Sequence, residues 1–214
     1  YLGTSINLLK SKGYKVCLNL MHIAQFSENL DSLPDSFNKL SMDVLYLGDS
    51  TGSLTADKLK KLITSIKNKW SGEIGIHAHD NLGLAYSNAT TVLKLGANFI
   101  DSTLLGMGRG AGNLKTETIY NYLYKGIHSK KIKNFNDKFF YPLLKKYNWG
   151  KNVYYKYAGI NRIHPTYVQE ILTNKNYQKK DYFKILEYLK KSDTKKYDPY
   201  NLYNFNHFNN NNGY

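Results

Sequence analysis

Two histidines separated by one residue, His77 and His79, are the residues of this sequence best suited to chemistry. They follow a short apolar run at residues 73–76 that is typical of a β-strand. Because side chains alternate between the two faces of a strand, both imidazoles are expected on one face, about 7 Å apart along the strand. Two imidazoles in this arrangement can bind one divalent metal, at about 2.0–2.1 Å per bond. The alternative is a pair of polar residues on a solvated strand face.

The two histidines belong to a repeating pattern of strands and helices. Apolar segments rich in β-branched residues predict four strands, at 14–21, 42–47, 73–79 and 98–104. Amphipathic segments predict helices between and before them, at 2–12, 55–70 and 84–95. This alternation indicates a parallel sheet built from βα units, in which functional residues gather at the C-terminal ends of the strands.

A glycine-rich segment, residues 106–113, follows the last predicted strand. Backbone amides of such a loop, next to the start of a helix, can hold a phosphate or a carboxylate, so we predict that Gly108 and Gly110 bind substrate. The same glycines loosely match a dinucleotide-binding fingerprint. That fingerprint needs an acidic residue about 20 positions further on, where this chain has residues 125–130 without one, so a nucleotide cofactor is disfavoured.

Charge is concentrated in the second half of the chain. Residues 1–113 carry a net charge of +2 and residues 114–214 a net charge of +12. There are 28 Lys and only two Arg, whereas base reading and bidentate phosphate contacts favour Arg, so we expect no nucleic-acid binding. No apolar run is long enough to predict a membrane span. The single cysteine, Cys17, excludes an internal disulfide; as a predicted core residue, it is compatible with a reducing cytoplasm.

Three motifs resemble, in the same order, those of the pyruvate carboxyltransferase-like metallolyases. They are Gly-Asp-Ser-Thr-Gly at 48–52, Gly-Ile-His-Ala-His-Asp-Asn-Leu-Gly-Leu-Ala at 75–85, and Gly-Met-Gly-Arg-Gly-Ala-Gly-Asn at 106–113. That superfamily holds 4-hydroxy-2-oxovalerate aldolases, 3-hydroxy-3-methylglutaryl-CoA lyases, and homocitrate and isopropylmalate synthases. The resemblance covers roughly residues 1–125. It implies an α/β fold, namely strands five to eight, the C-terminal half, of a (β/α)8 TIM barrel.

The resemblance also implies roles for individual residues. His77, His79 and Asn113 would bind a divalent metal, with Mn or Mg favoured and Co or Zn as alternatives. Asp49 and Ser50 would lie near the substrate. The first strand of the family carries an Arg-Asp pair, in which the Asp binds the metal and the Arg steadies an enolate, and no such pair occurs here. We therefore interpret the chain as a C-terminal fragment that is active only within a longer protein.

Within the superfamily, the glycine-rich segment is most similar to that of the aldolases, because it has their Gly-Met-Gly-x-Gly-Ala-Gly-Asn pattern and lacks the cysteine of the CoA lyases. We predict a metal-dependent aldolase that cleaves or forms a carbon–carbon bond next to a 2-oxo acid, through a metal-bound pyruvate enolate. One alternative is an acetyl-CoA-dependent Claisen synthase. Alternatives of another class are an inactive barrel fragment and a basic binding module. A dehydrogenase or a second copy of the chain is the expected protein partner.

Taken over its whole length, the sequence predicts three parts: a barrel domain at 1–125, a small helical appendage at 126–192 and a polar, disordered tail at 193–214. Within the appendage we expect helices at 134–147 and 181–191, and a loop at 158–164 that leads into a further helix. The catalytic base is unknown. The candidates for an acid or base that reaches over the C-terminal ends of the strands, the mouth of the sheet, are His164, Tyr167 and Tyr154. The alternative is that these three residues serve only in packing.

Overall fold

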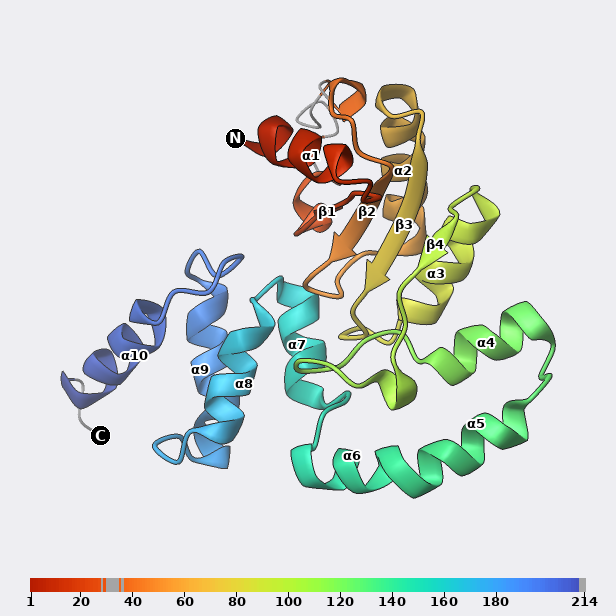
Figure 1. The fold of residues 1–214 in the computed structure, drawn as a ribbon. Coiled ribbons are helices and arrows are strands. Elements are labelled where there is room, and N and C mark those ends of the chain that lie inside the picture. Colours follow the sequence, from red (N-terminus) through yellow and green to blue (C-terminus); the bar gives the residue numbers. More distant parts are fainter. Residues whose placement is uncertain (28, 30–34, 36, 212–214) are drawn as a thin grey trace.

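The computed structural model describes residues 1–27, 29, 35 and 37–211, and a four-stranded sheet forms its centre (Figure 1). The strands are β1 (Cys17–Leu20), β2 (Val44–Asp49), β3 (Glu73–Ala78) and β4 (Phe99–Ile100). They are all parallel and lie in the order β1-β2-β3-β4, which confirms the predicted sheet. In Figure 1 the arrowheads of β2 and β3 point toward α7, so the C-terminal ends of the strands face the second half of the chain.

Three helices accompany the strands, as the amphipathic segments predict: α1 (Leu2–Ser11), α2 (Ala56–Lys69) and α3 (Ala85–Lys94). The large apolar residues of α2 repeat at the spacing of one helix face, and all four are buried: Leu59, Leu62, Ile63 and Ile66. Helix α3 ends just before Gly96, whose φ of +84° is the left-handed conformation expected of a residue that stops a helix.

The sheet has two unlike faces, because alternate residues of a strand point in opposite directions. We call one the packed face, since its side chains are buried in a core with α2 and α3: Leu45, Leu47, Ile74, Ile76 and Ala78. We call the other the open face, and apart from the buried Val44 its large side chains are half-buried or exposed: Cys17, Tyr46, His77 and Phe99. The prediction that Cys17 lies in the core is wrong, because β1 is the edge strand of the described sheet and Cys17 is exposed.

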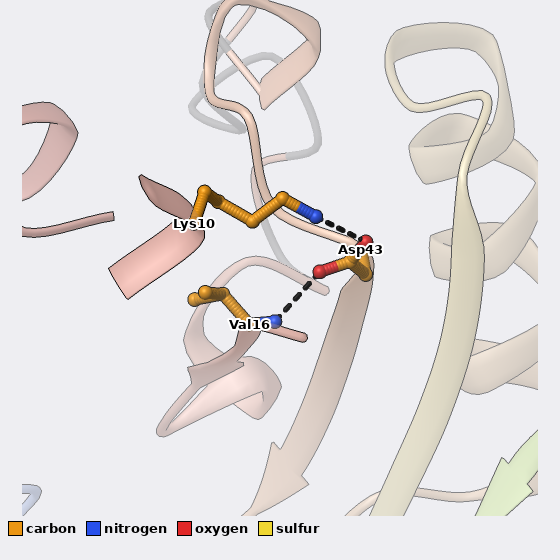
Figure 2. A network of polar contacts seen from close by, with 3 residues as sticks. All are labelled: Lys10, Val16 and Asp43. Carbon is orange, nitrogen blue, oxygen red and sulfur yellow. Dashed lines mark hydrogen bonds and ion pairs between the residues drawn. The ribbon is translucent and has the colours of Figure 1, made fainter. Parts of the chain in front are cut away.

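A polar contact at the N-terminal ends of the strands ties α1 to the sheet (Figure 2). One carboxylate oxygen of Asp43 lies 2.6 Å from the Lys10 ammonium, and the other accepts the backbone N–H of Val16 at 2.6 Å. These two hydrogen bonds lower the pKa of Asp43. The contact aligns the entrances of β1 and β2 on the side opposite the histidines.

Past the sheet, the chain runs through α4 (Thr116–Tyr124) and then a nearly continuous helical rod. The rod consists of α5 (Ser129–Phe135), the π-helical η5 (Asn136–Phe140) and α6 (Tyr141–Tyr147). It begins five residues before the predicted helix. The wider η5 turn ends two residues before Pro142, which has no N–H to donate and so cannot continue a regular α-helical ladder.

The last part of the chain forms a second core from α7 (Val153–Asn161), α8 (Pro165–Thr173), α9 (Tyr182–Lys190) and α10 (Tyr200–Asn211). The expected loop at 158–164 is wrong for residues 158–161, which belong to α7. Disorder of the whole tail is also wrong, since α10 buries Leu202 and Phe205 in this core. Burial of these two apolar residues compensates for the polar composition of the segment. Our domain boundaries remain predictions.

The described residues also include short helical turns at the strand ends and in the connections: η1 (Ile23–Gln25), η3 (Phe37–Lys39), η4 (Leu104–Gly106) and η6 (Lys179–Asp181). No helix in the described part of the chain has the length and apolar character required to cross a membrane.

Candidate active site at the mouth of the sheet

The His77 and His79 rings lie together at the C-terminal end of β3, with their centroids 5.2 Å apart. His77 Nδ1 is 3.0 Å from a carboxylate oxygen of Asp101, the residue that follows β4. This contact directs the other ring nitrogen of His77 away from Asp101, as in metal sites where a carboxylate orients a ligating histidine. We did not single out Asp101 in the sequence. An acid directly after the fourth strand, at the same end of the sheet, was the available signal.

Tyr46 completes this polar group on the open face. Burial, and next the Asp101 carboxylate beside it, raise the pKa of Tyr46 to about 12. The ring passes over Gly75 of the neighbouring strand, where an added Cβ would lie 2.6 Å from the Tyr46 ring. A glycine at this position therefore allows side chains of β2, β3 and the end of β4 to meet.

Asn113 reaches the histidines from the end of the glycine-rich segment, and it forms an isolated antiparallel bridge with His79. Its side-chain amide donates to the Met107 carbonyl at 3.3 Å, whereas its Oδ1 is buried without a hydrogen-bond partner. Gly108 is required here, because a Cβ would lie 2.6 Å from the amide nitrogen of Asn113. A buried, unpaired amide oxygen on a residue paired with His79 matches the donor chemistry expected around a divalent cation.

His77, His79 and Asn113 could therefore hold a metal, but they supply no anionic ligand. In the part of the chain that the structure describes, no three His, Cys, Asp or Glu side chains lie together as a metal-binding group. The pKa of His79 is lowered to about 4, chiefly by burial and then by His77, Arg109 and His164. The imidazole of His79 is thus neutral at pH 7, which is the form that binds metals.

Asp49 and Ser50 lie at the end of β2, yet both shape the backbone of the mouth. The two Asp49 oxygens accept the N–H groups of Ser53 and Leu54, each at 3.1 Å, and burial raises the pKa of Asp49 to about 6. Ser50 Oγ accepts the backbone N–H of His22 at 3.1 Å. Their role in substrate binding remains a prediction.

The second half of the chain closes over this mouth. Lys151, just before α7, lies 2.8 Å from a carboxylate oxygen of Asp80. The indole N–H of Trp149 donates to the Leu105 carbonyl at 3.0 Å. Gly110 brings the glycine-rich segment against Tyr155 of α7: its φ is +67°, and an added Cβ would lie 2.9 Å from the ring.

Of our three acid–base candidates, the structure brings one to the mouth. His164 is buried, and its ring centroid lies 5.8 Å from that of His22. The structure places Tyr167 elsewhere: it is fully buried, and its hydroxyl is bound by the Asp198 N–H and the Asn201 side chain, so an acid–base role for it remains only a prediction. Its hydroxyl therefore fastens the tail to α8.

The Tyr154 ring packs on Tyr182 and Phe183 of α9, with ring centroids at 5.3 and 5.0 Å, and an acid–base role for it remains only a prediction. The neighbouring Tyr155 takes the position near the glycine-rich segment instead, and burial raises its pKa to about 12. Two adjacent tyrosines of a helix point about 100° apart, so the sequence alone could not decide which one faces the mouth.

Comparison with known proteins agrees with this geometry. Residues 5–135, more than half of the chain, match the model of the HMGL-like family. The chain belongs to the HMGL-like family. The open face, the two histidines and the glycine-rich segment all lie within these residues.

Relatives of this HMGL-like chain include 4-hydroxy-2-oxovalerate aldolase from Carboxydothermus hydrogenoformans, which is 39% identical over 89 residues. That match covers 42% of this chain and 26% of the relative, so the matched part spans about a quarter of the relative's length.

Two solved structures share the fold. The N-terminal domain of a candidate aldolase from Bacteroides vulgatus is 32% identical with a TM-score of 0.70, covering 81% of this chain and 60% of that one. The carboxyl transferase domain of Rhizobium etli pyruvate carboxylase is 11% identical with a TM-score of 0.62, covering 88% and 35%. The four strands thus correspond to part of a TIM barrel.

Proposed function

We propose that this HMGL-like chain provides the C-terminal half of a metal-dependent carbon–carbon lyase of the aldolase type, which acts on 2-oxo acids. One observation carries the proposal: the ring centroids of His77 and His79 lie 5.2 Å apart at the mouth, and Asp101 orients the His77 ring. The aldolase relatives support it, although the chain spans only part of their length.

The residues of the mouth would divide the chemistry between them. His77, His79 and Asn113 would hold the cation, with Mn or Mg favoured. When bound, the cation would supply Lewis-acid stabilisation of the charge that develops when a bond next to a carbonyl breaks. Backbone N–H groups around Gly108 and Gly110 would hold the carboxylate of the 2-oxo acid.

His164 is suited to proton transfer or hydrogen bonding at this mouth. Its Nδ1 accepts the backbone N–H of Thr166 at 3.3 Å, so in the neutral ring the proton resides on Nε2. Burial, followed by Arg109 and His22, lowers the pKa of His164 to about 4 and keeps the ring neutral at pH 7. A neutral imidazole N–H can donate to a developing oxyanion or return a proton to a leaving group.

The test is an assay of the protein, expressed together with any coding sequence found upstream of Tyr1, with Mn²⁺ and a series of 4-hydroxy-2-oxo acids. We expect pyruvate release that is lost in a His77→Ala/His79→Ala double variant. Removal of one charge-stabilising group can lower a rate by about 10²–10³-fold, and loss of two ligands should lower it at least as much. The 214-residue chain alone should be inactive.

Three outcomes would count against the proposal. Unchanged pyruvate release in the double variant would reject the metal-site assignment. Turnover of acetyl-CoA without pyruvate release would identify a Claisen synthase instead. No turnover of either substrate by the longer protein would favour an inactive barrel or a binding module.

A further inference from the structure

Both arginines of a chain that otherwise uses lysine lie at the mouth. The sequence has 28 Lys and two Arg, Arg109 and Arg162. Arg109 belongs to the glycine-rich segment, and Arg162 ends α7 and lines a small pocket with His22, Thr51 and Lys195. A guanidinium differs from an ammonium in presenting a planar fork that matches the oxygens of a carboxylate or phosphate. The placement of both guanidiniums at one mouth therefore indicates an oxyanion.

His22 is held in an unusual conformation beside them. Its backbone φ is +55°, a left-handed conformation that costs a non-glycine residue free energy and is found preferentially at functional sites. The Ser50 hydroxyl fixes its backbone N–H, and its Nδ1 is buried without a hydrogen-bond partner. A strained residue with an unsatisfied buried nitrogen, facing the His164 ring at 5.8 Å, calls for a further binding partner.

Arg109 is close to both histidines and is incompletely satisfied. Its positive charge contributes to the lowered pKa values of His22 and His164. Its guanidinium makes a long contact, 3.4 Å, with the Thr166 hydroxyl. Among the described residues, no carboxylate forms an ion pair with it. The Arg109 guanidinium lies at a partly buried mouth and has no acidic partner there in the described part of the chain, so it is available to a ligand.

We propose that Arg109, His22 and His164 form an oxyanion subsite, with Arg162 and Lys195 at its rim. The subsite would bind a second anionic group of the substrate, a carboxylate or a phosphate other than the reacting 2-oxo acid. The inference rests on the proposed function only in treating that anion as part of the lyase substrate. The binding of the anion follows from the side chains alone.

The test uses the 214-residue chain with a chelator present and without turnover. Inorganic phosphate or succinate is titrated at ionic strength held constant with NaCl, and the histidine ring signals are followed by NMR. We expect saturable shifts at His22 and His164. Arg109→Ala should weaken binding roughly tenfold, the scale of one charge-assisted hydrogen bond, and Arg109→Lys should weaken it less.

Lys145→Ala is the matched control, because Lys145 is an exposed cation of α6, outside the oxyanion subsite. It should leave both titrations unchanged. Shifts that do not saturate, or equal weakening in Arg109→Ala and Lys145→Ala, would overturn the subsite. Tighter binding of phosphate would assign a phosphorylated substrate, and tighter binding of succinate a substrate with a second carboxylate. Since no metal or turnover is involved, anion binding by the 214-residue chain, together with no pyruvate release by the longer protein, would reject the lyase and retain the subsite.

Discussion

The packed and open faces of the sheet are made by neighbouring residues of the same strands, and they differ in almost every property. Ile76 is buried in the core, whereas the next residue, His77, faces the other way and contacts Asp101. The packed face is apolar except for the buried Asp49 at its C-terminal edge. The open face brings together an imidazole, a carboxylate and a tyrosine hydroxyl.

This difference shows how a strand separates stability from chemistry. A side chain on the packed face contributes mainly by removing apolar surface from water. A side chain on the open face contributes little to that burial, so its identity is free to serve binding. Substitutions on the two faces should therefore affect different measurements, and the following predictions test that division.

The largest effect is expected for metal binding by the open face. His77→Ala/His79→Ala should abolish Mn²⁺ binding, measured by calorimetry or electron paramagnetic resonance, because two of the three proposed ligands are lost. The free energy of unfolding of this double variant should stay close to that of the unmodified chain, although metal binding is lost. His128→Asn, at a histidine remote from the mouth, is the control. Equal Mn²⁺ affinity in the double variant and the control would contradict the assignment of metal binding to the open face.

A packed-face substitution should show the reverse pattern. Ile76→Ala should lower the free energy of unfolding by about 2–5 kcal/mol, because it removes a fully buried side chain and leaves a cavity. Denaturant titration measures the loss, and Mn²⁺ affinity of the folded fraction should persist. Phe99→Ala on the open face, where the side chain is 39% exposed, should cost less. A larger cost for Phe99→Ala would contradict the assignment of the faces.

Asp101→Asn should weaken metal binding by about 10–100-fold, the usual consequence of losing a carboxylate that orients a ligating histidine. The readout specific to this role is the His77 ring, whose Nδ1 proton should lose its carboxylate partner and shift in nitrogen NMR. Restoration of affinity by Asp101→Glu would support positioning. If the His77 nitrogen signal does not shift in Asp101→Asn, the 3.0 Å contact does not orient the ring.

Acid should destabilise the mouth. The pKa of His164 is lowered to about 4 in the folded chain from 6.5, so the unfolded chain binds more protons between these values. The stabilisation is complete above about pH 6.5 and is lost as the pH falls toward 4. His164→Asn, which can still accept the Thr166 N–H, should reduce the loss between pH 7 and pH 5 by about 1–2 kcal/mol. Identical pH profiles of the two proteins would exclude a buried neutral ring.

The smallest effect is expected for Cys17. Cys17→Ser should change the free energy of unfolding by no more than about 0.5 kcal/mol, as for other exposed positions. A thiol reagent should label Cys17 in the native 214-residue chain without denaturant. Protection of the thiol until the chain unfolds would place Cys17 in a core and contradict the open face at β1.

The sequence by itself determined the local parts of this protein. Period-two and period-3.6 apolar patterns placed four strands and the helices α1, α2 and α3, because these patterns reflect which residues face a core. Strand alternation predicted that His77 and His79 share a face. The three ordered motifs indicated the family, which the match over residues 5–135 confirms.

Only the tertiary structure decided which distant side chains meet. Asp101 reaches His77 because β4 pairs with β3, and His22 meets His164 because α8 folds back over the mouth. The same limit explains why the sequence pointed to Tyr154 whereas Tyr155 contacts the glycine-rich segment, since the rotation of α7 is set by its packing against α9 and that segment. The tertiary structure likewise decided that the tail is helical. Two apolar residues of α10 are enough to hold this helix once a core exists to receive them, and no local sequence pattern reveals that core.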